Sequence, residues 1–394
     1  MLMMMVPPKV RKAVRMITTT AQQYWYGFHR VATPCGASPQ AALRLDNAPT
    51  LAHPTETRLR VSKLALDSTS ARFLREANPE DPSAEIASIV EQRGKMHNPH
   101  TSSGGVLLAT IEEIGAESPL LDEGRFAVGD HVVPLSSLSC IPLRLTDTLG
   151  FHGEVASVDG TAILFGASPV AAIPDDIDPA ICLLALDISS LVPQVERAVE
   201  PFFFPSKPAS LDLDHVGVDL QPPCVYIQGM GKSGLSAMAS IRRLEATACP
   251  KRKQPIRILA SDTDEHAANS EIASKYCDAT AVLDSRDAQA TMDFLYRENH
   301  SLEADLVLAT HNQPDCETSA VMACKERGRV IFFSMATIFS QANLATDVAG
   351  KDVDCSFGVG IAQDQDVAVF TLLRDDADLR KHFKSLAEDL AKHL

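Results

Sequence analysis

The chain has 394 residues, a formal net charge of −15 and 45% apolar side chains, which suits a soluble protein with two domains of ordinary size. The negative charge argues against a nucleic-acid backbone as the main partner. No apolar run approaches the roughly 20 residues of a membrane-spanning helix, so we expect neither nucleic acid nor a membrane as a partner.

The N-terminus is basic. Residues 1–45 contain no acidic side chain, while lysines and arginines recur through them. This composition is typical of a mitochondrial transit peptide, and a disordered bacterial leader or a misassigned start codon would explain it as well. We expect residues 1–25 to be a leader, cleaved or disordered. The protein would then lie in the mitochondrial matrix if the leader is a transit peptide, and otherwise in the cytoplasm.

Residues 26–195 have the pattern of a small β domain. Short apolar runs with β-branched residues alternate with turn formers such as Gly129-Asp130, and this predicts a β-barrel-like domain that would hold the substrate. A long apolar helix is predicted at its end, over 179–199. The remaining predictions are strands at 58–66, 106–111 and 132–133, a helix at 84–93 and a loop at 97–105.

A proline-rich, acidic connecting segment is expected over 196–223, and strands alternate with helices after it, from 224 to 362. That alternation predicts a parallel sheet covered by helices on both faces. A last helix within 363–394, with an apolar stripe of Leu379, Phe383, Leu386 and Leu390, is expected to pack at the domain interface. The predicted strands are a run starting at 224 and 256–261, 279–283, 306–309 and 329–333, and the helices are 236–246, 265–276, 288–298 and 317–326.

The most specific motif is a glycine turn between the first of these strands and its helix. Gly229 would permit the tight turn, Gly231 would let the backbone approach a pyrophosphate, and Gly234 would let the helix pack close to the strand. The helix opens with Lys232 and Ser233, and its N-terminus presents free N–H groups and a positive dipole end to phosphates. The motif predicts a Rossmann domain with a dinucleotide; a structural turn in an unrelated α/β fold is the alternative.

The next strand ends on Asp262. A carboxylate there would accept hydrogen bonds from the adenosine ribose and repel a 2′-phosphate, which favours NAD over NADP. Asp264 is the competing ribose ligand. Two loops, 309–312 and 332–337, would follow later strands of the sheet, and Ser334 and Thr337 are candidate partners for the nicotinamide. Both loops could instead be ordinary turns with incidental hydroxyls.

Several long strings of the sequence resemble the L-erythro-3,5-diaminohexanoate dehydrogenases, a family of the medium-chain dehydrogenase/reductase group. The resemblance covers about 26–360, and the basic leader and the expanded proline-rich segment depart from it. The strings that carry it are 26–31, 39–47, 93–105, 231–235, 332–337 and 350–352.

The resemblance implies a GroES-like β-barrel domain followed by a Rossmann doubly wound parallel-sheet domain, with NAD as cofactor. It also implies a reaction of lysine degradation, in which the amine-bearing carbon of L-erythro-3,5-diaminohexanoate gives a hydride to NAD. Hydrolysis of the imine then releases ammonium and leaves 5-amino-3-oxohexanoate. We expect a small-molecule diamino acid as the substrate and a homo-oligomer, a dimer.

Many medium-chain dehydrogenases hold zinc, but good ligands are absent at the three corresponding positions. Asp67-Ser68, Ser103-Gly104-Gly105 and Leu186-Asp187 stand there. The nine cysteines form no Cys-x-x-Cys pair, and we interpret them as reduced, mostly buried thiols. We therefore expect no metal in the site.

Without zinc, Asp67 and Asp187 would face the substrate and suit its ammonium groups. Asp187 could instead lie on a helix surface. His97 is the candidate proton shuttle near pH 7, with a capping or core histidine as the alternative. Arg30 or Lys95 could hold the substrate carboxylate, although such side chains are more often solvated.

Two other functions remain open from the sequence. One is a zinc-free alcohol or quinone oxidoreductase of the same fold, and the other is a catalytically silent NAD-binding protein with a structural or regulatory role. The substrate-domain strings argue against the first, and an intact glycine turn does not exclude the second.

Overall fold

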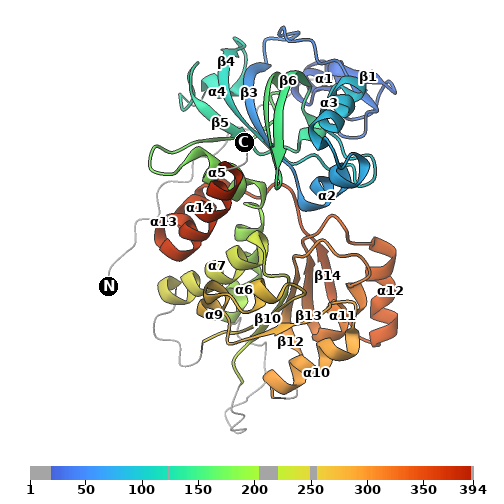
Figure 1. Cartoon of the computed structure of the whole chain (residues 1–394), viewed down its shortest axis with the longest axis vertical. Helices are drawn as coiled ribbons and strands as arrows, with labels where there is room; N and C mark the ends of the chain where they lie inside the picture. Colours follow the sequence, from blue (N-terminus) through green and yellow to red (C-terminus); the bar gives the residue numbers. More distant parts are fainter. Residues whose placement is uncertain (1–18, 123, 204–220, 249–254, 301, 392–394) are drawn as a thin grey trace.

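The computed structural model of the chain describes residues 19–122, 124–203, 221–248, 255–300 and 302–391. Most of the expected leader and most of the proline-rich segment lie outside these residues. Two six-stranded sheets organise the rest (Figure 1), one antiparallel and one parallel. The expected α/β fold class, with a β domain before a doubly wound domain, is confirmed.

The antiparallel sheet has the strand order β6-β7-β3-β4-β5-β8. In β3 the side chains of Leu59 and Val61 are buried, while Arg60 between them is exposed, so one face of the strand packs on the core. A small sheet of β1 and β2 lies beside it. The elements of this half are α1 (Thr19–Trp25), β1 (Val31–Thr33), β2 (Arg44–Leu45), β3 (Thr57–Ala65), α2 (Ser68–Ala77), α3 (Pro82–Arg93), β4 (Val106–Ile114), α4 (Pro119–Asp122), β5 (His131–Pro134), β6 (Leu143–His152), β7 (Val155–Leu164) and β8 (Val170–Ala172).

The parallel sheet has the order β11-β10-β9-β12-β13-β14, the arrangement of a Rossmann domain, in which the order reverses between β9 and β12. Every residue of β9 is buried. Val225 and Ile227 pack into one apolar cluster and Cys224 and Tyr226 into another, because both faces are covered. The elements are β9 (Cys224–Gln228), α7 (Lys232–Ala248), β10 (Arg257–Asp262), α8 (Glu265–Ala268), α9 (Glu271–Tyr276), β11 (Ala279–Val282), α10 (Ala288–Glu298), β12 (Ala304–Ala309), α11 (Glu317–Ala323), β13 (Cys324–Phe332), α12 (Phe339–Ala349) and β14 (Asp354–Phe357).

The single helix predicted over 179–199 is wrong, because the chain breaks there into α5 (Pro179–Asp187) and α6 (Leu191–Phe203), bent by 54°. The hydroxyl of Ser189 donates to the Leu186 carbonyl at the break, which satisfies a helix-end acceptor. The break places Asp187 at the end of α5, and α6 packs against α7. Among the described residues no single helix is long and apolar enough to cross a membrane; α5 and α6 reach that composition only as a bent pair.

Two smaller predictions also differ. The helix predicted over 265–276 is divided into α8 and α9, because Ser270 caps α9 by accepting from the Ala273 amide. The helix α11 ends at Ala323, and the chain runs directly into β13.

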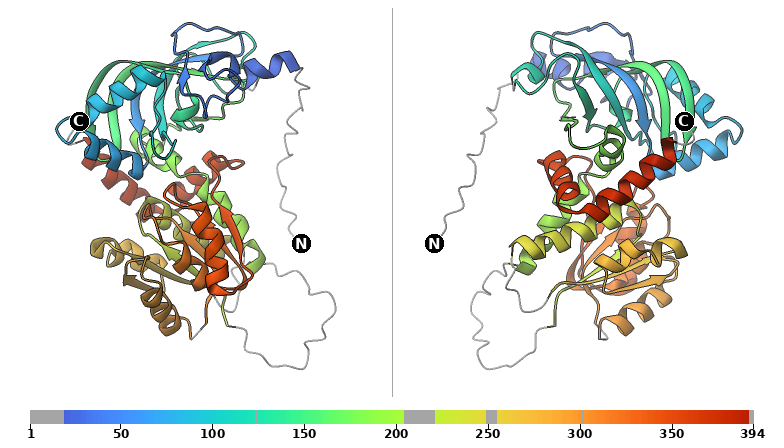
Figure 2. Two further views of the ribbon diagram at one scale, coloured as in Figure 1. Left: turned by 90° about the vertical axis from the view of Figure 1, so that its right-hand side faces the viewer. Right: turned by 60° about the vertical axis from the view of Figure 1, so that its left-hand side comes forward.

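The chain ends in α13 (Gln365–Asp375) and α14 (Ala377–Ala391). Leu379 and Phe383 of α14 are fully buried, and the helix packs against α5 and also against α7 and α9 of the parallel half. Figure 2 shows α14 along the junction of the two halves. The side chain of Leu390, the last member of the predicted apolar stripe, lies outside the described residues.

Candidate active site

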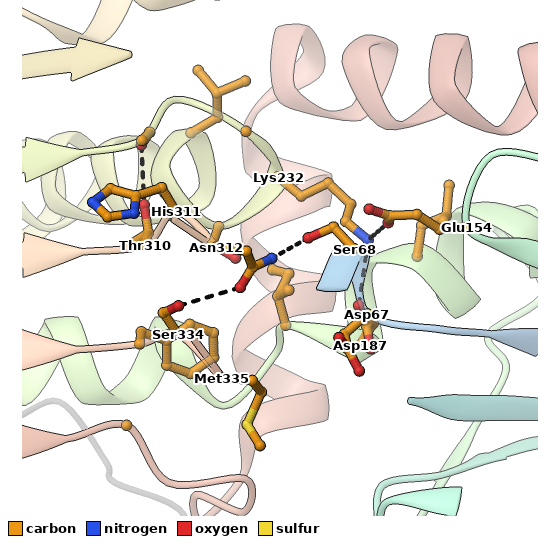
Figure 3. A pocket seen from close by; sticks show the side chains of 18 of the residues that line it. Asp67, Ser68, Glu154, Asp187, Lys232, Thr310, His311, Asn312, Ser334 and Met335 are labelled. Atoms are coloured by element: carbon orange, nitrogen blue, oxygen red, sulfur yellow. Dashed lines mark hydrogen bonds and ion pairs between the residues drawn. The ribbon is translucent and has the colours of Figure 1, made fainter. Parts of the chain in front are cut away.

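A cavity of about 1110 Å³ lies between the two sheets, and both halves of the chain line it. The carboxyl ends of β9, β10, β12 and β13 open into it, and this is the edge at which doubly wound sheets bind their ligands. The opposite wall carries Asp67 and Glu154, and Asp187 projects from the end of α5 (Figure 3).

The glycine turn has the geometry that a dinucleotide requires. Gly229 has φ +100°, a conformation that L side chains rarely adopt. A Cβ added at Gly234 would lie 2.0 Å from the Gly229 carbonyl oxygen, whereas one added at Gly231 would meet nothing within 4 Å. Gly231 thus borders open space at the start of α7, where N–H groups without helical partners can hold a phosphate.

Asp262 is fixed at the end of β10. Its carboxylate accepts from the Met230 amide at 2.6 Å and from the Asp264 amide at 2.9 Å, and the residue lines the cavity. The Asp264 carboxylate accepts from the His266 amide as the cap of α8. Asp262 is therefore held toward the glycine turn, where an adenosine ribose would lie.

The two loops predicted to follow β12 and β13 meet in the cavity. The Ser334 hydroxyl donates to the Asn312 side chain at 3.3 Å, and the Asn312 amide donates across the cavity to the Ser68 hydroxyl. Ser334 and Thr337 both line the cavity. Burial lowers the pKa of His311, whose Nδ1 accepts from the Gln313 amide, so this imidazole is neutral near pH 7.

Lys232 joins the two halves of the site. Its Nζ lies 2.6 Å from Glu154 Oε2 and 3.3 Å from Asp187 Oδ2 (Figure 3). The three side chains are between 10% and 27% exposed, so solvent screens this pair of ion pairs less than it would a surface one.

The pKa values reflect an excess of negative charge. Burial raises the pKa of Asp187, and Glu154 and Asp67 raise it further, against the effect of Lys232. Burial alone would lower the pKa of Lys232, but Asp187 and Glu154 outweigh it, so the pKa rises. Lys232 is therefore charged, and its ammonium group pairs with two carboxylates, those of Glu154 and Asp187.

Comparison with known proteins identifies the family. The model for the N-terminal domain of L-erythro-3,5-diaminohexanoate dehydrogenase matches residues 29–174. An L-erythro-3,5-diaminohexanoate dehydrogenase from Fusobacterium nucleatum is 31% identical over 369 residues, which cover 92% of this chain and 98% of the relative. The chain belongs to the L-erythro-3,5-diaminohexanoate dehydrogenase family. A second dehydrogenase of that name, from Acetoanaerobium sticklandii, is 29% identical with the same coverage.

A solved structure supports the two-domain fold of this family member. A mycobacterial protein determined in complex with NADPH aligns with a TM-score of 0.50 and 13% identity, over 90% of this chain and 94% of that one. At this identity the likeness concerns the fold.

In this family member Asp67 and Ser103, which stand where many medium-chain dehydrogenases have zinc ligands, are hydrogen-bonded to other protein groups. Asp67 caps α2 by accepting from the Ser70 amide at 2.9 Å, and it also accepts from the hydroxyls of Ser70 and Ser103 at 2.8 and 2.7 Å. Asp67 therefore acts as a helix cap that adds negative charge to the cavity. Within the described ranges, no three His, Cys, Asp or Glu side chains are grouped so that they could hold a metal ion.

Three other candidates lie apart from the cavity. His97 is not among the lining residues, and burial, with Lys95 and Arg93 nearby, lowers its pKa. Arg30 is 1% exposed and donates to both oxygens of Glu56. Lys95 is fully buried and donates to two backbone carbonyls, and burial lowers its pKa to about 8. The structure gives neither cation access to a substrate carboxylate, and the role of His97 stays a prediction that the geometry does not support.

Sequence reasoning missed Glu154 and underestimated Lys232. Glu154 lies in the turn between β6 and β7, and its backbone carbonyl accepts from the Leu66 amide, which brings the hairpin against Asp67. Only the pairing of distant strands places Glu154 opposite the glycine turn, and no local pattern marks it. Lys232 was predicted only as a cofactor-binding residue, and its ion pairs with Glu154 and Asp187 were not predicted.

Proposed function

We propose that this protein catalyses the NAD-dependent oxidative deamination of L-erythro-3,5-diaminohexanoate to 5-amino-3-oxohexanoate, with release of ammonium. The supporting observation is an anionic wall, formed by Asp187, Glu154 and Asp67, that faces a dinucleotide-type glycine turn across one cavity. The two relatives that carry the dehydrogenase name align over 98% of their length, so both halves of the site are part of the match.

The chain offers a complete set of groups for NAD. The N-terminus of α7, beside Gly231, would hold the two phosphates, with Lys232 and Ser233 at its first turn, and Asp262 would bind the adenosine ribose. The fixed carboxylate of Asp262 would repel the 2′-phosphate of NADP. Ser334 and Thr337 would contact the nicotinamide from the β13–α12 loop. Bound NAD would accept the hydride from C3 of the substrate.

The protein must supply a base, since a carbon that bears an ammonium group cannot release a hydride until the nitrogen has a free lone pair. Asp187 suits this role, because its raised pKa makes it a better proton acceptor than an ordinary carboxylate. It would take one proton from the C3 ammonium. After hydride loss, water adds to the C3 imine, and the carbon–nitrogen bond breaks to give the ketone and ammonium.

A substrate panel tests the proposal. Purified protein is assayed for NADH formation and ammonium release with L-erythro-3,5-diaminohexanoate, with simple alcohols and with quinones plus NADH. The proposal predicts turnover of the diamino acid with one ammonium per NADH. Turnover of alcohols or quinones alone would favour the zinc-free oxidoreductase, and nucleotide binding without turnover of any compound would favour a catalytically silent protein.

The expected homodimer would use the outer edge of the parallel sheet. β14 pairs with β13, and no described strand pairs with its other edge, so a second copy could extend the sheet there. The helix α12 beside it exposes Phe339, Leu344 and Val348 at 69%, 56% and 70%. Apolar exposure of this kind next to an unpaired edge is typical of an interface.

A further inference from the structure

Lys232 has two possible anionic partners, one on each side. It is the first residue of α7 and directly follows the glycine turn that would hold the coenzyme's phosphates. Its side chain instead crosses the cavity to Glu154 and Asp187, with the ammonium nitrogen 2.6 and 3.3 Å from their oxygens. One flexible side chain therefore lies within reach of both the coenzyme site and the anionic wall.

The ammonium of Lys232 is chemically the same group that the substrate would bring. A subsite of two carboxylates that binds a lysine ammonium at these distances is also shaped for the ammonium on C3 of a diamino acid. Both cations cannot occupy it at once, because each needs the same two oxygens and like charges at contact distance repel each other.

We infer that Glu154 and Asp187 form the subsite for the reacting ammonium of the substrate, and that Lys232 fills it until the coenzyme's pyrophosphate draws Lys232 away. This inference rests on the proposed function. A pyrophosphate at the start of α7 carries two negative charges beside the Lys232 backbone, and a lysine is a common partner of a phosphate. Binding of NAD would thereby open the ammonium subsite and leave Asp187 free to take the proton.

This exchange makes binding of the two ligands mutually dependent. The nucleotide should raise the affinity for the diamino acid, and by linkage the diamino acid should raise the affinity for the nucleotide by the same factor. A coupling of roughly 10-fold is within the range usual for such effects. It also makes substrate binding weaker before the hydride acceptor is present.

The test measures equilibrium binding with ADP-ribose, which carries both phosphates but accepts no hydride. Calorimetric titration gives the dissociation constant of L-erythro-3,5-diaminohexanoate with and without saturating ADP-ribose, for the wild-type protein, for Lys232→Met and for a control, Lys275→Met. Lys275 also pairs with two carboxylates, Asp376 and Asp378, but it does not line the cavity.

ADP-ribose should tighten diamino acid binding roughly 10-fold in the wild-type protein and in the Lys275→Met control. In Lys232→Met the diamino acid should already bind tightly alone, with little further effect of ADP-ribose, and ADP-ribose itself should bind more weakly. Loss of diamino acid affinity in Lys232→Met both with and without ADP-ribose would overturn the exchange, because Lys232 would then hold the substrate directly. A wild-type protein without coupling would overturn it too.

A crystal structure with ADP-ribose separates the two proposals. We expect Lys232 Nζ on a phosphate oxygen and away from Glu154 and Asp187. If Lys232 stays on both carboxylates beside a bound pyrophosphate, the exchange is wrong even for an active enzyme. If Lys232 moves but the protein neither binds nor oxidises the diamino acid, the proposed function is wrong and the ammonium subsite fails with it.

Discussion

Alanine at Gly231 and alanine at Gly234 should have opposite effects, although the two positions are three residues apart in the same turn. At Gly234 the new Cβ would lie 2.0 Å from the Gly229 carbonyl oxygen. Both atoms are attached to backbone, so β9 and α7 would have to separate. We expect the free energy of unfolding to fall by about 3 kcal/mol, the upper end of the usual cost of overpacking.

At Gly231 the new methyl group meets no protein atom within 4 Å, and we expect the free energy of unfolding to change by less than about 1 kcal/mol. The methyl group would instead occupy the space of the pyrophosphate. Losing one charge-assisted hydrogen bond costs about 1.5–3 kcal/mol, which corresponds to a roughly 10- to 150-fold weaker affinity for NAD.

Urea denaturation and calorimetric titration with NAD measure the two effects, and each variant is the control for the other. Gly234→Ala should lower the denaturation midpoint, whereas Gly231→Ala should keep it and lose NAD affinity. Normal NAD binding by a stable Gly231→Ala protein would refute the position of the phosphates. An equal loss of stability in both variants would refute the claim that Gly234, and not Gly231, is needed for close packing of α7 on β9.

Three further perturbations test other parts of the account. Asp187→Asn should lower kcat/KM for the diamino acid by roughly 10²–10⁴-fold in steady-state assays, as expected for removal of a base, with NAD affinity retained; activity within twofold of wild type would exclude Asp187 as the base. The pKa of Glu56 is lowered from 4.5 to about 2, because hydrogen bonds from Arg30 and His29 outweigh burial. The pKa of Glu56 is lower in the folded protein than in the unfolded chain, so the free energy of unfolding of the wild type should be highest above pH 4.5 and fall as the pH drops toward 2. By chemical denaturation, Glu56→Gln should be about 3 kcal/mol less stable than the wild type at pH 7, and its stability should vary less between pH 4.5 and 2. Equal stability of the two proteins would contradict the ion pair. Val348→Glu should convert a dimer into monomers in light scattering, and an unchanged mass would place the interface elsewhere.

The parts of the site that follow from local chain geometry could be predicted from the sequence. Gly229, Gly231 and Gly234 act through the backbone of one turn, so their spacing between a strand and a helix was sufficient to predict a tight turn, an open position and a packed position; the structure shows a positive φ at Gly229, open space at Gly231 and close packing at Gly234. Asp262 followed in the same way from the end of the next strand.

The parts that depend on pairing across the fold could not be predicted. The sequence alone leaves Arg30 as a candidate for binding the substrate carboxylate. In the structure its side chain is buried and forms an ion pair with Glu56, 26 residues away. Glu154 has no local signature and reaches the cavity only because its hairpin packs beside β3. The break after Asp187 was not predicted, because the helical residues before and after it are mostly apolar and read as one helix; in the structure the Ser189 hydroxyl donates to the Leu186 carbonyl at the break.

The central claim is that C3 of the diamino acid gives its hydride to NAD in this cavity. Deuterium at C3 of L-erythro-3,5-diaminohexanoate tests it directly, by mass spectrometry of the reduced coenzyme and assay of ammonium in the same reaction. We expect one deuterium in each NADH and one ammonium released with it. Unlabelled NADH, or ammonium release without coenzyme reduction, would contradict it.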